Sequence, residues 1–124
     1  MSIKDMVQKS FGSNLASGRE RIRIDALILA YPHGITINGI DLLPVSNEDR
    51  TYPIFTFAED DTKYFCGSGD IPKLGDTILE ACEGCISDAQ AELKSEPLKV
   101  RIMKVKTKSG YWYTKVEMIR NEVD

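Results

Sequence analysis

The residues best suited to chemistry surround one turn near the end of the chain. Three lysines spaced two apart lead into Ser109-Gly110, and three consecutive aromatic residues follow it. Lysines neutralise phosphates and release counterions, and aromatic faces stack on bases at ~1–3 kcal/mol per base. The combination predicts sequence-tolerant binding of a single nucleic-acid strand, DNA or RNA. The residues expected to bind it are Lys104, Lys106, Lys108, Tyr111, Tyr113 and Lys115, with Arg101, Tyr52 and Tyr64 as further candidates.

The same residues also fit a purely structural role, because aromatic side chains are good strand formers and lysines protect strand edges from aggregation. Side chains alternate between the two faces of a strand. We assign one face of the last strand to the core and the other to solvent, with a one-residue slip able to exchange them. The core face is Trp112, Val116 and Met118, and the solvent face is Tyr111, Tyr113 and Lys115.

Charge is divided unevenly along the chain. The net charge is −3, but residues 98–120 hold seven basic side chains and one acidic one, for a net of +6, so the remaining residues carry −9. An approaching ligand responds to the local field rather than to the total. We therefore expect an anionic partner to dock on the final third of the chain. Arg19, Arg21 and Arg23 form a smaller basic patch. This patch is either an extension of the surface that contacts the nucleic-acid backbone or a solvated helix face.

None of the motifs in the sequence predicts catalysis. Cys82 and Cys85 form a CxxC pair within a helical pattern, which we interpret as packing rather than as a metal or redox site. Only Cys66 and His33 could add soft ligands, and His33 lies in a turn. The acidic run at 59–61 is typical of a solvated turn between strands. We expect no enzyme activity, no metal and no cofactor.

Periodicity divides the chain into an N-terminal helical extension at 1–34 and a β-rich unit at 35–120. Helix starts are indicated at Ser2 and, by the capping-box pattern, at Ser17. Residues 20–31 match both helical and strand spacing; the cap and Pro32 favour helix. From Ile35 the pattern predicts three strands, a helix over 71–96 and a closing hairpin around Lys108-Ser109-Gly110, with a bulge or bend at Gly39.

Three strands, one helix and two strands is the chain order of the oligonucleotide-binding (OB) barrel, which has five strands with a helix between the third and fourth. We therefore predict a mainly β fold with helices, a five-stranded OB-fold-like barrel preceded by the helical extension. An ordinary α+β sheet with one crossover helix is the alternative.

Length and composition set the outer limits. The 124 residues fit a single domain, 42% hydrophobic and 28% charged, which is typical of a globular protein. No apolar run approaches the ~20 residues of a membrane span, and the N-terminus lacks a signal-peptide core. We expect a cytoplasmic protein without a membrane partner. Three cysteines without a secretion signal do not predict a disulfide framework.

Four segments carry a resemblance to a known class of protein: SFGSNLASGR, YPHGITINGID, YPIFTFAEDDTKYF and KTKSGYWYTKVE. Together they resemble small single-stranded-DNA-binding-type proteins of phages and conjugative elements, over most of the chain but through short motifs. The resemblance implies a barrel, no catalysis and a role in protecting single strands. The final RNEVD departs from the bacterial housekeeping pattern, which ends in a long acidic tail with a hydrophobic tip, so partner recruitment by such a tail is not implied.

Two further expectations concern partners. A protein-interaction or accessory module of a mobile element, using the same basic patch on an acidic partner, is the alternative function. Single-strand binders often gain affinity by presenting several barrels, so a homo-oligomer is also compatible with the sequence.

Overall fold

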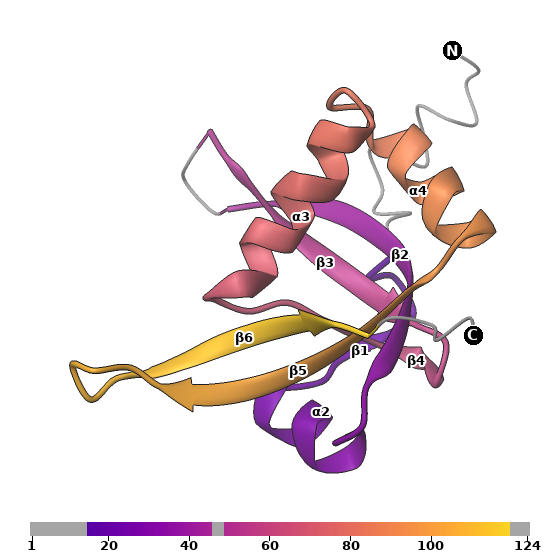
Figure 1. Cartoon of the computed structure of the whole chain (residues 1–124). Helices are drawn as coiled ribbons and strands as arrows, with labels where there is room; N and C mark the ends of the chain where they lie inside the picture. Colours follow the sequence, from indigo (N-terminus) through magenta and orange to yellow (C-terminus); the bar gives the residue numbers. More distant parts are fainter. Residues whose placement is uncertain (1–14, 46–48, 120–124) are drawn as a thin grey trace, which may run out of the picture.

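The computed structural model describes residues 15–45 and 49–119 (Figure 1). The helix predicted from Ser2, part of the polar loop after Val45, and Arg120 lie outside these residues. In chain order the elements are β1 (Glu20–Arg21), α2 (Ile24–Ala30), β2 (Ile35–Pro44), β3 (Thr51–Phe57), β4 (Asp60–Phe65), α3 (Asp70–Ala81), α4 (Ile86–Ser95), β5 (Leu98–Lys106) and β6 (Trp112–Met118).

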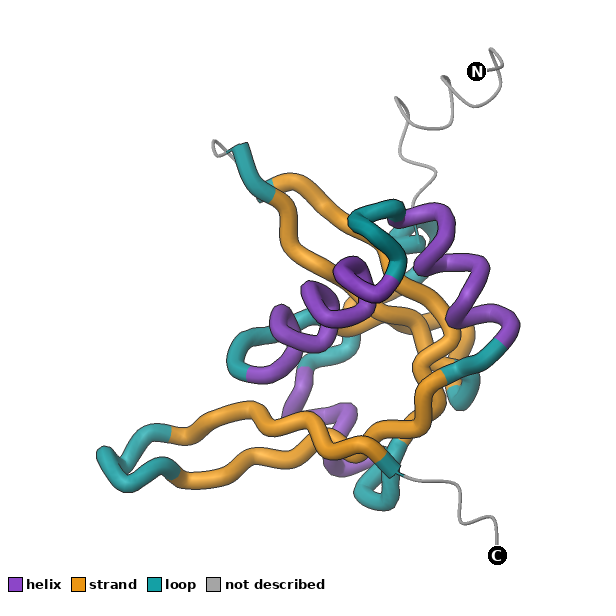
Figure 2. The backbone as a smooth tube through the Cα atoms, turned by 45° about the horizontal axis from the view of Figure 1, so that its top comes forward, coloured by secondary structure: helices purple, strands orange, loops and turns teal. Residues whose placement is uncertain are grey.

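The described strands form one curled sheet in the order β1-β4-β3-β2-β5-β6 (Figure 2). All neighbouring pairs are antiparallel except β1 and β4, which are parallel. The register between β2 and β3 shifts between Ile37 and Gly39, which confirms the predicted bulge. Bulges bend and twist a strand, and this one lies beside residues 35–37, where β2 also pairs with β5. β2 thus joins the two arms of the sheet.

The sheet is a half-barrel, and the prediction of a closed five-stranded barrel is wrong. Closure would need β4 and β6 to pair, but each edge has another partner. β1 lies along β4, where the Ile22 amide donates to the Tyr64 carbonyl at 2.9 Å. On β6, the Val116 amide donates to Asp70 Oδ2 at 3.0 Å. Satisfied edge groups have no need of a further strand, so the arms remain apart.

The concave side of the sheet is filled by the core. Phe55, Phe57 and Phe65 are fully buried, with ring centroids 5.5 Å apart for Phe55–Phe65 and 5.9 Å for Phe57–Phe65. Alternation in the second strand of the sequence predicts that Phe55 and Phe57 share a core-facing side, and the structure confirms this burial. Burying three such rings makes the largest apolar contribution to the fold. Helices α3 and α4 cover one side of this half-barrel, and the β5–β6 hairpin projects beyond it (Figure 1).

The helix predicted over 71–96 is two helices. At the end of α3 the Gly84 amide donates to the Leu79 carbonyl at 2.7 Å and the Glu83 amide to the Glu80 carbonyl at 3.1 Å. This pair of bonds is a Schellman motif, which ends a helix through a left-handed residue. Glu83 has φ 54° and Gly84 φ 79°. The CxxC pair therefore lies in the turn between α3 and α4 and not inside a helix.

The described part of the predicted helical extension is not purely helical. Residues 20–21 form β1 and residues 24–30 form α2, so each reading of 20–31 holds for part of it. The helix follows a strand that belongs to the main sheet, and Leu27 of α2 is only 1% exposed within the common core. In the described part of the chain, no helix combines the length and apolar character needed to cross a membrane.

Candidate nucleic-acid interface

The candidate site is the outer part of the β5–β6 hairpin, from Lys104 to Thr114. Its turn is closed by the Thr107 amide, which donates to the Tyr111 carbonyl at 2.8 Å, and by Gly110 at φ 87°. The register pairs Lys106 with Trp112 and Lys104 with Thr114. Cross-strand partners share a face. This face continues the core-facing side of both strands past the end of the core.

Trp112 is 67% exposed, so its predicted place in the core is wrong. The alternation itself holds, because Thr114, two residues further along β6, is buried. Trp112 lies on the same side of β6 as Thr114, but in the part of the hairpin that extends beyond the half-barrel. Lys106 Nζ lies 6.0 Å from the centroid of its ring, within cation–π range. Tyr111, at the turn, is 74% exposed. Met118, also predicted as core, is 52% exposed.

Tyr113 is fixed against the start of α3. Its hydroxyl donates to Asp70 Oδ1 at 2.5 Å and accepts a hydrogen bond from Lys73 Nζ at 3.0 Å. Lys73 Nζ also lies 5.5 Å from the centre of the ring. In the register Tyr113 is opposite Val105, so it lies on the other face of the hairpin from Lys104 and Lys106. The structure therefore separates two residues that were predicted to act together with those lysines: Tyr113 and, on the same face, Lys115.

The other predicted residues are spread more widely. Lys104, Lys106, Lys108 and Lys115 are exposed, whereas Arg101 is half-buried and pairs with Glu117 at 3.5 Å, which offsets its charge. Tyr52 is 37% exposed near the start of β3, and Tyr64 is half-buried near the end of β4. Both tyrosines lie on the arm of the sheet that β2 separates from β5. The residues brought together are the lysines at 104, 106 and 108 with Tyr111 and Trp112.

Asp70 connects the hairpin to α3 and should make the fold sensitive to acid. The hydrogen bond from Tyr113, and then that from the Val116 amide, hold the pKa of Asp70 below its usual value. A carboxylate with a lowered pKa stabilises the fold fully above its unfolded pKa of about 3.9, and this stabilisation is lost as pH falls through the folded pKa. We expect Asp70→Asn to lower the free energy of unfolding at pH 7 by about 1–3 kcal/mol.

Urea unfolding at pH 7 and at about pH 3.5, which is below the unfolded-state pKa of about 3.9 for an aspartate, checks this prediction. The difference between wild type and Asp70→Asn should shrink at the lower pH. Asp76→Asn is the matched control, because Asp76 is exposed on the same helix. An equal loss at both pH values, or an equal loss in the control, would contradict the role given to Asp70.

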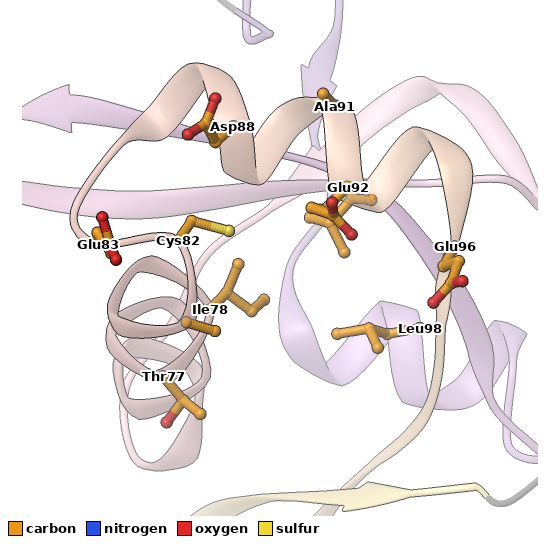
Figure 3. Close-up of a pocket in the computed structure, with 11 residues that line it drawn as sticks. Thr77, Ile78, Cys82, Glu83, Asp88, Ala91, Glu92, Glu96 and Leu98 are labelled. Carbon is orange, nitrogen blue, oxygen red and sulfur yellow. The ribbon is translucent and has the colours of Figure 1, made fainter.

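A cleft lies between α3 and α4, and its charge is opposite to that of the basic hairpin (Figure 3). It encloses about 590 Å³. Ile78, Cys82 and Leu98 point toward the space between the helices, and the rim is acidic; none of the described residues that line it is basic. Repulsion between like charges makes the cleft unsuitable for phosphates. The acidic lining residues are Glu83, Asp88, Glu92 and Glu96.

The two cysteines of the CxxC pair are not bonded to each other. All three cysteines are free. Burial, followed by the nearby Glu92 and Asp88, raises the pKa of the Cys82 thiol, which disfavours the thiolate that redox chemistry and metal binding require. Cys85 Sγ lies 3.2 Å from Ser87 Oγ. Among residues 15–45 and 49–119, no three His, Cys, Asp or Glu side chains are grouped so that they could hold a metal ion.

Sequence reasoning missed two features of the site. The first is exposed Trp112, and the only signal for it was the possibility of a different register. The second is the position of Arg21 and Arg23, which flank Ile22 in the extended segment before α2 and line a cavity together with Lys104. Comparison of the chain with protein-family models, with curated proteins and with solved structures gave no match.

Proposed function

We propose that this chain binds single-stranded nucleic acid with little sequence preference through the outer part of the β5–β6 hairpin. The observation that carries the proposal is the exposure of two neighbouring rings, Trp112 and Tyr111, beside exposed lysines. Exposed rings offer a stacking surface to any base, and ammonium groups compensate the phosphates between stacked bases. Lys106 Nζ, 6.0 Å from the centroid of the Trp112 ring, places a cation for a phosphate beside this stacking surface.

The distribution of charge supports the same face. The acidic side chains that outweigh the lysines in the total charge include those of the α3–α4 cleft, which lies apart from the hairpin tip. A polyanion is then repelled from the cleft and attracted to the hairpin. The net charge of −3 does not oppose binding, because the screening length of about 8–10 Å at physiological salt makes the local field decisive.

The strand connections support a relationship to the OB fold. β2, β3 and β4 form a meander, β5 and β6 add on the other side of β2, and the helical segment lies between β4 and β5. This is the order of an OB fold, in which the loop between the last two strands contributes to ligand binding. The open side between β4 and β6 is the difference. By its resemblance to phage and conjugative-element proteins, we propose a role in the DNA metabolism of a mobile element.

Titration with a labelled oligo-dT of about 30 nucleotides tests the proposal, because one OB unit occupies about 4–16 nucleotides. Trp112 is the only tryptophan, so its emission reports directly on the hairpin. We expect quenching on binding, and a slope of log K against log salt near −2, since each of three lysine–phosphate contacts contributes about −0.7 on a single strand.

Oligo-rU and a duplex of the same length are the comparisons. Binding of the duplex with equal affinity would show a backbone-only interaction and contradict the stacking. Absence of oligonucleotide binding at about 50 mM salt by the folded protein would sink the proposal, because electrostatic binding is strongest at low salt. The basic hairpin would then be the docking surface for an acidic protein.

A further inference from the structure

The gap between the two arms of the half-barrel contains a polar cavity of about 450 Å³. One wall comes from β1 and the start of α2, another from residues 66–68 after β4, and a third from the middle of the β5–β6 hairpin. Four residues give it its chemical character: Arg21, Arg23, Lys104 and Thr114. A closed barrel would have no such opening, because β4 and β6 would be paired across it.

The cavity gathers positive charge from distant parts of the chain. Arg21 ends β1 and Arg23 precedes α2, with Ile22 between them packed against the core, so both arginines fall on the side away from the core. Lys104 comes from β5 on the opposite arm. Within residues 15–45 and 49–119 none of these three cations has an ion pair. Of the described residues that line the cavity, Asp25 alone is acidic, which leaves an excess of two positive charges among them.

Thr114 supplies a second and independent indication. It is 2% exposed, and its Oγ1 atom is buried without a hydrogen-bond partner in the described part of the chain. Buried hydroxyls nearly always have a partner, and an unsatisfied one calls for a specific explanation. Thr114 lies directly across from Lys104 on the same face of the hairpin and lines the cavity. A ligand with several acceptor oxygens would satisfy this hydroxyl and the cations together.

We propose that this cavity binds a phosphate group. The planar guanidinium groups of Arg21 and Arg23 match the oxygens of a phosphate in bidentate fashion, Lys104 adds a point charge, and Thr114 Oγ1 donates a hydrogen bond. That this phosphate belongs to the strand held by the hairpin rests on the proposed function. That the cavity has an affinity for phosphate does not depend on it. Lys104 belongs to both surfaces and would connect them.

The test uses the full chain and inorganic phosphate as the probe, with binding followed by NMR shifts of backbone amides. We expect saturable shifts centred on residues 66–68 and 114. Arg21→Gln/Arg23→Gln should weaken phosphate binding at least tenfold, and Thr114→Val several-fold. Because the Thr114 hydroxyl has no partner among the described residues, its removal should not lower the melting temperature. Lys99→Gln, an exposed cation of β5 that does not line the cavity, should bind like the wild type.

Two oligonucleotides identify the source of the phosphate. Tighter binding of 5′-phosphorylated than of 5′-hydroxyl oligo-dT, lost in Arg21→Gln/Arg23→Gln, would assign the cavity to a strand end. If the two oligonucleotides bind equally well to the wild type and both bind more weakly to Arg21→Gln/Arg23→Gln, the cavity would be assigned to an internal phosphate. Phosphate binding without oligonucleotide binding would retain the cavity and reject the strand-binding function. Phosphate affinities of the arginine and threonine variants equal to that of wild type would overturn the inference.

Discussion

Replacing Tyr111 and Trp112 together by alanine is expected to weaken binding of oligo-dT by about 30-fold or more. Each base–aromatic stack contributes about 1–3 kcal/mol, so the two rings together account for at least about 2 kcal/mol, and every 1.4 kcal/mol is a factor of ten in affinity. The salt dependence should remain nearly unchanged, because the lysines are untouched. Anisotropy of the labelled oligonucleotide measures both quantities without using the removed tryptophan.

This variant should fold normally, which makes the prediction sharp. The two rings are 74% and 67% exposed and lie outside the core, so their loss removes little buried area. Leu29→Ala is the matched control: it truncates another large apolar side chain, 83% exposed on α2. Trp112→Phe, which keeps a stacking face, should retain most of the affinity. A double variant within twofold of wild type would show that the rings do not stack on bases.

Gly69→Ala is expected to lower the free energy of unfolding by about 3 kcal/mol or more, because it adds a steric clash with neighbouring backbone to a backbone strain of about 1–3 kcal/mol. Gly69 has φ 66° and ψ −122°, a conformation that residues with a Cβ rarely adopt. A Cβ atom there would also lie 2.4 Å from the Thr114 carbonyl oxygen and 3.1 Å from the Thr114 amide nitrogen. Backbone cannot rotate away as a side chain can, so β6 and the start of α3 would have to separate.

Gly110→Ala separates the two costs. Gly110 also has a positive φ, 87°, but an added Cβ would meet no atom of the described residues within 4 Å. Only the backbone strain remains, and we expect a loss of about 1 kcal/mol. Urea unfolding of both variants measures the difference. Equal losses would contradict the close approach of Gly69 to β6. Gly69→Ala should also disrupt the hydrogen bonds that Asp70 accepts from Tyr113 and Val116, since Asp70 is the next residue.

The sequence by itself determined the order of the strands from Ile35 onward and part of the core. Alternation over residues 35–65 predicted three strands with Phe55 and Phe57 inside, and the structure buries both. The lysine–Ser–Gly–aromatic pattern predicted the β5–β6 hairpin, and Gly39 predicted the bulge of β2. These features depend on local chemistry: side-chain period, turn residues and the absence of a Cβ. Such preferences act over a few residues and can therefore be seen in the chain itself.

Only the tertiary structure decided which faces and edges are covered. Alternation placed Trp112 on the core-facing side of β6, but whether that face meets a core depends on how far the hairpin extends beyond the half-barrel. From the sequence alone the edges of β4 and β6 could pair with each other, but in the structure β1 pairs with β4 and Asp70 accepts a hydrogen bond from the Val116 amide of β6. The approach of Arg21 and Arg23 to Lys104 follows from the same open gap. Each is a contact between residues distant in the chain, and periodicity within one segment carries no information about such contacts.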